Sequence, residues 1–152
     1  MQENRIRFHY LVRPFYFPDR VSIKKFLLHQ LTSKRVEVEA INYIFCNDEY
    51  LLNINRDYLK HDTYTDIITF DLSEPGRSLI ADIFISVQRV KENAKTLNHF
   101  FSEELRRVIF HGALHLAGYK DKSVLEQKRM REMEEDWLKA YNVSREIKSS
   151  KH

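Results

Sequence analysis

The chain has 152 residues, 43% hydrophobic and 31% charged, enough for one domain with a sizeable core. It has no run of about 18 apolar residues and no apolar segment near its start, so we expect no membrane span, no secretory signal and a cytoplasmic location. A net charge of +3 allows a nucleic-acid partner without requiring one, and the single cysteine, Cys46, excludes an internal disulfide.

The first half of the chain alternates strand and helix patterns. Residues 6–12 are rich in β-forming side chains and predict a strand. Apolar residues at helical spacing predict a helix over residues 23–33, with Asp19 or Ser22 as its N-cap. Residues 36–45 alternate at their start and predict a second strand.

The pattern continues in the middle of the chain. Asn47 or Asp48 is the expected N-cap of a helix that runs through Tyr58. Residues 66–72 predict a third strand. Residues 79–87 are apolar almost throughout, which predicts a strand in the centre of the sheet.

The last third is helical by pattern. Helices are expected over residues 87–97, 102–117 and 123–141. Ser102 is the expected N-cap of the middle helix, and Gly118 is placed to end it in a left-handed conformation.

Together these elements predict an α+β fold, with a mixed sheet of about four strands and roughly five helices packed on it. We expect a single domain over residues 1–143 and a disordered basic tail over residues 144–152.

The stretch HGALHLAGYKD, residues 111–121, has the spacing of a metal site. His111 and His115 share one helix face, and a turn at Gly118 lets Asp121 return as a third ligand. Three protein ligands with an open fourth position are typical of catalytic zinc. The alternative is two histidines at the edge of the core and an unrelated surface aspartate. Gly112 costs about 1 kcal/mol in a helix, which indicates a close approach of another element or of a substrate.

The same spacing is similar to the metzincin protease pattern H-E-x-x-H-x-x-G-x-x-H, except that Gly112 replaces the catalytic glutamate. Because peptide hydrolysis at such a site needs that carboxylate as a general base, we expect that the protein is not a protease.

Three blocks of sequence point to one family. Residues 111–119 match the start of H-G-x-L-H-L-x-G-Y-D-H, and residues 52–70 match an Asn–Tyr stretch leading into T-D-V-x-[ST]-F. Residues 81–86 match G-D-I-x-I-S, with Ala81 for the glycine. In these blocks and their order the chain resembles the bacterial YbeY proteins. The resemblance implies a metal-dependent endoribonuclease, specific for single strands, in ribosomal RNA maturation and ribosome quality control. It also implies one Zn²⁺ per chain, and single-stranded RNA, ribosomal RNA and the small ribosomal subunit as partners, without DNA or a membrane.

Two departures from the family pattern bear on the site. Asp121 stands where the family has its third ligand, a histidine, which makes the metal a weaker Lewis acid. Leu59 stands where the family usually has an arginine thought important for activity. Arg56, Lys60 or His61 could supply the missing cation. The expected catalytic residues are therefore His111 and His115 together with Arg56 and Lys60.

Other polar residues have simpler expected roles. Asp66 either caps a strand or lines the site, Asp82 is structural, and Glu104 lies on a solvated helix face or orients a histidine. Residues 128–136 are expected to form an exposed face with paired charges, and Arg89 to hold RNA phosphates with Arg56 and Lys60.

Two other functions stay open at this point. One is an RNA-binding or ribosome-binding assembly factor whose metal is structural, which Leu59 favours. The other is a hydrolase that uses the same zinc on peptides or small molecules, and Gly112 argues against the peptide version.

Overall fold

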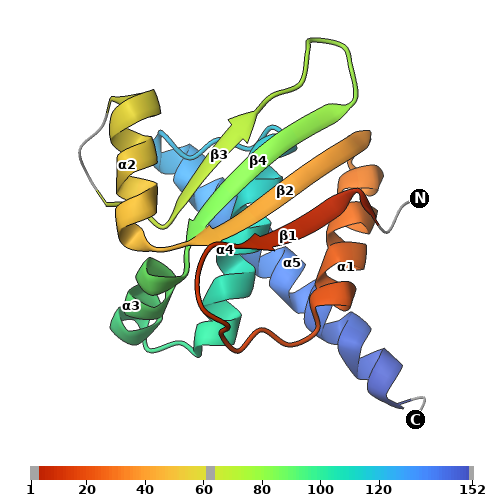
Figure 1. Ribbon diagram of the computed structural model, residues 1–152. Helices are drawn as coiled ribbons and strands as arrows, with labels where there is room; N and C mark the ends of the chain where they lie inside the picture. Colours follow the sequence, from red (N-terminus) through yellow and green to blue (C-terminus); the bar gives the residue numbers. More distant parts are fainter. Residues whose placement is uncertain (1–3, 61–63, 151–152) are drawn as a thin grey trace.

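The computed structural model describes residues 4–60 and 64–150 (Figure 1). In this part of the chain it has one four-stranded sheet and five helices, so the predicted α+β class is confirmed. The strands are β1 (Ile6–Tyr10), β2 (Val38–Cys46), β3 (Ile67–Asp71) and β4 (Leu79–Ser86). The helices are α1 (Arg20–Ser33), α2 (Asp48–Leu59), α3 (Val87–Leu97), α4 (Phe101–Leu116) and α5 (Val124–Ser150).

The sheet is mixed, in the order β1-β2-β4-β3. Strands β1, β2 and β4 run parallel, and β3 pairs antiparallel with β4 at one edge. The predicted central position of β4 is confirmed because it has a neighbour on both sides. Ala81, Ile83 and Ile85 of β4 are fully buried on one face of the sheet.

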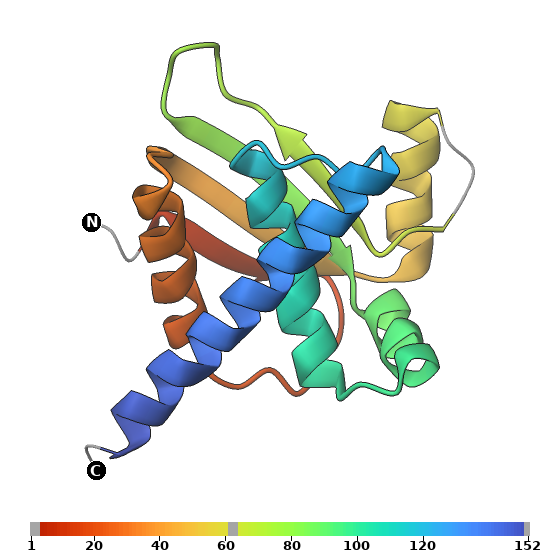
Figure 2. The ribbon, with the colours of Figure 1, turned by 180° about the vertical axis from the view of Figure 1, so that it is seen from behind.

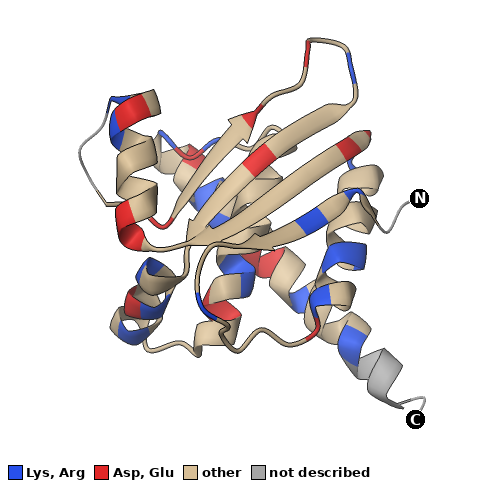
Figure 3. Cartoon of the chain, viewed as in Figure 1, with Lys and Arg blue, Asp and Glu red and all other residues tan. Residues whose placement is uncertain are grey.

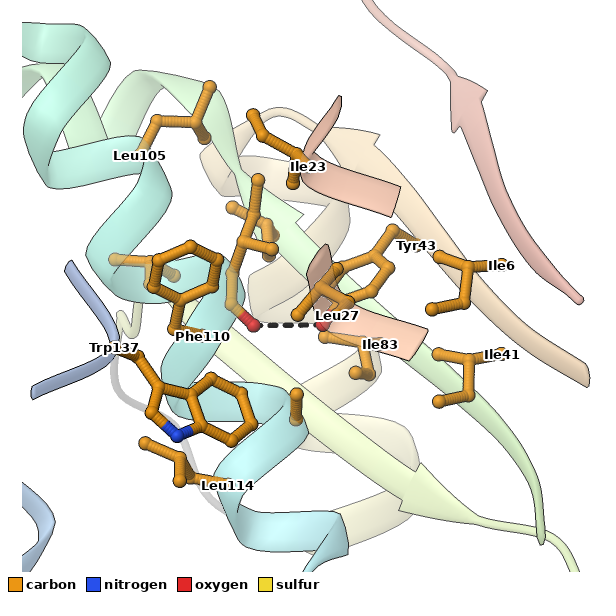
Figure 4. Close-up of a cluster of buried hydrophobic side chains, with 14 of the residues drawn as sticks. Ile6, Ile23, Leu27, Ile41, Tyr43, Ile83, Leu105, Phe110, Leu114 and Trp137 are labelled. Atoms are coloured by element: carbon orange, nitrogen blue, oxygen red, sulfur yellow. Dashed lines mark hydrogen bonds between the residues drawn. The ribbon is translucent and has the colours of Figure 1, made fainter. Parts of the chain in front are cut away.

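Helices α1, α4 and α5 cover that face, with α5 crossing over α4 (Figure 2). Their apolar side chains and those of the strands form the main core, part of which Figure 4 shows. The hydroxyl of the buried Tyr43, on β2, donates to the main-chain carbonyl of Ile109, on α4, at 2.8 Å. This bond satisfies a polar atom that would otherwise be costly to bury, and it ties α4 to the centre of the sheet.

The opposite face of the sheet is covered only in part, by α2 (Figure 1). Leu51 and Ile54 of α2 form a small buried cluster with Cys46 and Ile68 of the sheet. Beyond α2 this face carries polar side chains: Asn42 donates to Asp82 across strands β2 and β4 at 3.1 Å. Asp82 therefore has the structural role expected from the sequence.

The predicted N-caps of α2 and α4 can be compared with the structure. Asn47 is the N-cap of α2, and its side chain accepts from the backbone N–H of Tyr50 at 2.8 Å, as predicted. The prediction of Ser102 for α4 is wrong, because the backbone N–H of Glu104 already donates to the carbonyl of Phe100 at 3.1 Å. This bond makes Phe100 the N-cap and places Ser102 inside the first turn.

The end of α5 differs from the expectation. A disordered tail was expected from residue 144, but the helix continues through Ser150. Residues 142–150 contain neither Gly nor Pro, so nothing in the chain breaks the helix there. Arg145 also pairs with Asp19 at 2.6 Å. The domain boundary at residue 143 stays a prediction.

Some residues named in the sequence analysis, among them His61, lie outside the described part of the chain. Among the helices that are described, none combines the length and the apolar character needed to span a membrane.

Candidate metal centre

Helix α4 places His111 and His115 side by side, with ring centroids 4.8 Å apart. The helix ends as the sequence predicted, with Gly118 in a left-handed conformation at φ +103°. The N–H of Gly118 donates to the carbonyl of His115 at 3.0 Å, and that of Tyr119 to the carbonyl of Leu114 at 3.1 Å. This pair of bonds is the Schellman motif, and it turns the chain back toward the histidines.

The turn brings Asp121 to both histidines. Its Oδ2 lies 3.3 Å from Nε2 of His111 and 3.2 Å from Nε2 of His115. A tetrahedral zinc ion with ligand bonds of about 2.0–2.1 Å separates its ligand atoms by about 3.3–3.4 Å. Among the described residues, these three form the one group of three or more able to share a metal ion. The geometry and the donor atoms therefore fit a divalent metal.

Glu134, on α5, holds one of the two imidazoles. Its Oε2 lies 2.7 Å from Nδ1 of His111. When Nδ1–H donates to this carboxylate, the lone pair of Nε2 is left facing Asp121 and His115. Glu134 thus fixes both the tautomer and the ring orientation that a metal ligand needs.

Glu134 is held in turn by Arg107. The Nη1 of Arg107 lies 3.4 Å from Oε1 of Glu134, and its other side-chain nitrogens face Glu104 and Glu135. Glu104 also contacts His99 at 3.3 Å. A row of hydrogen bonds and ion pairs, largely shielded from solvent, therefore links His99, Glu104, Arg107, Glu134 and His111 in that order. Because Glu134 and Glu104 are only 8% and 4% exposed, these pairs are shielded from solvent and fix positions better than surface pairs do.

The charges around His111 shift its titration. Burial alone lowers the pKa of His111, but the hydrogen bond and charge of Glu134, with the charges of Asp121 and Asp66, raise the pKa above its usual value. Burial raises the pKa of Asp66, against the effect of His111. Asp66 therefore lies beside the candidate site, where it also accepts from Asn93 at 3.4 Å.

Gly112 has a packing explanation. A Cβ at this position would lie 3.0 Å from Cδ1 of Ile67 and 3.1 Å from Cδ1 of Ile83. The close approach predicted from the glycine is therefore that of the sheet. It brings α4, and with it the two histidines, down onto strands β3 and β4.

The expected cations occupy a different helix, on the opposite face of the sheet. Arg56 lies in the last turn of α2, and Lys60 is its C-cap. Both are exposed, as is Leu59. Arg89 does not have the expected free charge, because its Nη2 pairs with Asp48 at 2.6 Å.

Sequence reasoning missed Glu134 and Arg107. Residues 128–136 were expected to form an exposed face, but Glu134 is buried there. The signal was present, because Met130, Met133, Trp137 and Leu138 form an apolar helical stripe and Glu134 lies within it. A glutamate in such a stripe needs a buried partner. Glu104 is also buried rather than solvated. The histidine that it contacts is His99, not one of the candidate metal ligands His111 and His115.

Comparisons with known proteins agree with this architecture. Residues 20–142 match the sequence model of the family described as "Endoribonuclease YbeY". A relative of that name from Cytophaga hutchinsonii is 45% identical over 135 residues, which are 89% of this chain and 94% of the relative. Another from Flavobacterium psychrophilum is 44% identical over 138 residues, 91% and 97% of the two chains.

The fold is similar to that of a solved structure. The solution structure of TM1509 from Thermotoga maritima superposes with a TM-score of 0.61 at 23% identity, covering 97% of this chain and 95% of that one. Two histidines and an aspartate that converge on one point form a ligand set of the kind that metal-dependent hydrolases use. On the family match and the extent of these identities, the chain belongs to the YbeY endoribonuclease family.

Proposed function

We propose that this chain is a zinc-dependent endoribonuclease that cuts single-stranded RNA in the maturation of ribosomal RNA and in ribosome quality control. The small ribosomal subunit is its proposed partner. Family membership supports RNA cleavage. The observation that carries the metal dependence is the convergence of Asp121 on both histidines at 3.2–3.3 Å.

In this proposal His111, His115 and Asp121 hold one zinc ion. Two imidazoles and one carboxylate suit zinc better than Mg²⁺ or Ca²⁺, which prefer oxygen ligands alone. A divalent ion in this position supplies Lewis-acid activation of water and stabilises the negative charge that develops on phosphate. The protein contributes the fixed ring of His111, through the proton that Nδ1 shares with Glu134.

The RNA strand needs cations to hold its phosphates. Arg56 and Lys60 are proposed for this role, because both are exposed at one end of α2. Figures 1 and 2 show α2 and the start of α5 at the same edge of the sheet, beside β3. Long, exposed basic side chains reach phosphates without a fixed geometry, which is how non-specific strand binding usually works.

One observation favours the alternative of a weakly catalytic assembly factor with a structural metal. Leu59, where the family pattern has an arginine, is 42% exposed and carries no charge toward a phosphate. If Arg56 and Lys60 do not replace that arginine, RNA binding would persist with little cleavage.

Cleavage of labelled RNA by the purified protein tests the proposal. Single-stranded RNA should be cut, a duplex of the same sequence should not, and a chelator should abolish cutting until zinc is restored. Leu59→Arg should raise the rate modestly if Arg56 and Lys60 already act as its substitutes. Binding without cleavage in the wild type, together with strong cleavage by Leu59→Arg, would favour the assembly factor. Cleavage that survives the chelator would contradict the metal-dependent mechanism.

A further inference from the structure

A groove away from the metal centre runs between the segment after β1 and helix α3. Its volume is about 590 Å³, and Phe101, at the start of α4, is part of its lining. Phe15 and Phe101 meet edge to face, with ring centroids 6.1 Å apart, and give the groove an apolar wall. Polar and charged side chains also line the groove, which distinguishes it from a gap in the core.

The groove lies where an open sheet with parallel strands is expected to bind a ligand. Residues 12–16 follow the carboxyl end of β1, and Asn47 follows that of β2. From these two ends the chain leaves in opposite directions, to α1 on the main-core face and to α2 on the other. Such a change of direction between neighbouring parallel strands leaves a crevice at their carboxyl ends.

Three cations line the groove: Arg13, Lys91 and Lys95. All three are exposed, and none forms an ion pair with the residues that the structure describes. Arg89, Arg107 and Arg145, by contrast, are all paired within the fold. Figure 3 marks basic residues along the ribbon of α3 and of the segment after β1. With Glu92 as the one acidic residue among those described in the lining, the groove favours an anionic occupant.

The groove also presents an exposed aromatic ring. Tyr16 is 74% exposed, although it lies among the lining residues. Proteins bind single-stranded nucleic acids by stacking bases on aromatic rings while cations follow the phosphates. An exposed ring in a groove with cations that form no ion pair with the described residues fits this mode of binding. An acidic protein segment would use the cations but has less need of the ring.

We propose that this groove binds single-stranded RNA and holds the strand that is cut at the metal centre. This inference rests on the proposed function. Phe101 and His111 are ten residues apart on α4, which is about 15 Å at 1.5 Å per residue. At about 3.4 Å per stacked nucleotide, a strand must be roughly five nucleotides long to span that distance. The groove therefore acts on longer RNA and has no effect on a trinucleotide.

The test compares two variants of the zinc-loaded protein, each with three substitutions. Arg13→Ala, Lys91→Ala and Lys95→Ala remove the groove cations. The control, Lys25→Ala, Lys128→Ala and Lys139→Ala, removes the same charge from exposed positions on α1 and α5. The salt slope is the slope of the logarithm of the binding constant against the logarithm of the salt concentration. Loss of three phosphate contacts should reduce the magnitude of this slope for a single-stranded 12-mer by about 2 and weaken binding about 100-fold at 0.1 M salt. The KM for cleavage of the 12-mer should rise with kcat unchanged, and trinucleotide cleavage should not change.

The ring is tested separately. Tyr16→Ala should weaken 12-mer binding by about 5- to 160-fold without changing the salt slope, because stacking carries no charge. Tyr16→Phe keeps the ring and should bind as the wild type does. If both substitutions leave the affinity unchanged, bases do not stack on Tyr16 and the strand does not lie in this groove.

The results separate this inference from the proposed function. If the wild type cuts the 12-mer and the groove triple binds it with unchanged affinity and slope, the groove inference is overturned and the nuclease stands. If binding depends on the groove but no RNA is cut with any divalent metal, the proposed function fails and the groove remains an RNA site. If polyglutamate binds the groove while RNA affinity is unchanged in the triple variant, the occupant is an acidic protein segment and the inference is wrong.

Discussion

Helices α4 and α2 carry the residues predicted for the site, and the fold holds them very differently. Helix α4 lies in the main core, and its polar face is tied to α5 through Arg107 and Glu134. Helix α2 lies on the opposite face of the sheet, where its Leu51 and Ile54 pack with Cys46 and Ile68 in a small buried cluster. Its basic residues, Arg56 and Lys60, lie at its exposed end.

This difference matches the two tasks proposed for the helices. A metal centre needs ligands held within a few tenths of an ångström, and buried ion pairs beneath His111 supply that rigidity. Contacts to RNA phosphates need charge and reach more than fixed positions. Changes at α4 should therefore alter metal binding and the rate of cleavage, and changes at α2 should alter RNA affinity.

The largest effect is expected from removing a ligand. His111→Ala or His115→Ala should reduce bound zinc from about one equivalent to near zero and abolish cleavage, because two ligands alone bind zinc weakly. His29→Ala, on an exposed face of α1, is the control and should keep both. Zinc content measured by atomic spectrometry decides the matter. Variants that bind as much zinc as the wild type would place the metal elsewhere.

Next in size is the loss of the carboxylate behind His111. Glu134→Gln keeps the volume but loses the charged acceptor, so zinc affinity should fall about 10- to 100-fold. Glu132→Gln, an exposed neighbour on α5, should change it little. Competition with a chelator measures both. Equal zinc affinities in the two variants would mean that Glu134 supports only the packing of α5.

A smaller effect is expected at α2. Removing two phosphate contacts with Arg56→Ala and Lys60→Ala should reduce the salt slope of RNA binding by about 1.4 and weaken binding about 20-fold at 0.1 M salt. Zinc content should stay at the wild-type level. Lys128→Ala with Arg131→Ala, on the exposed face of α5, provides a control of equal charge. A loss of zinc in the α2 variant would show that the two helices do not have separate tasks.

The smallest functional effect is expected from probing how firmly α2 is held. Burial, with a contribution from the charge of Asp48, raises the pKa of the Cys46 thiol to about 12. At pH 8 almost no thiolate is present in the native state, so iodoacetamide should react only when α2 opens. Ile54→Ala removes a contact beneath α2 and should speed labelling at least about tenfold, since such truncations cost roughly 2 kcal/mol or more. Zinc content should stay unchanged. Rapid labelling of the wild type would show that Cys46 is accessible without such opening.

Features that depend on local chemistry were predictable from the sequence. Asn47 caps α2 through its own side chain, and Gly118 ends α4 because a left-handed residue is needed there. The regular spacing of His111 and His115 and the turn after them predicted a shared site, and the structure brings these side chains together with Asp121.

Features that depend on tertiary contacts were harder to predict. The partner of Glu134 is 23 residues away in sequence, and only the crossing of α5 over α4 makes them neighbours. Gly112 indicated a close approach but not what approaches it, because Ile67 and Ile83 come from two different strands. The start of α4 was misplaced because the carbonyl of Phe100, rather than the side chain of Ser102, accepts the first helical bond.

RNA cleavage is proposed to depend on one metal ion held by His111, His115 and Asp121. The most direct test of this dependence is a titration of the metal-free protein with zinc, following cleavage of single-stranded RNA at each addition. The rate should rise in proportion to added zinc and level off at one equivalent per chain, with no rise for His111→Ala. A rate that is already maximal before zinc is added, or that rises equally in His111→Ala, would contradict this dependence.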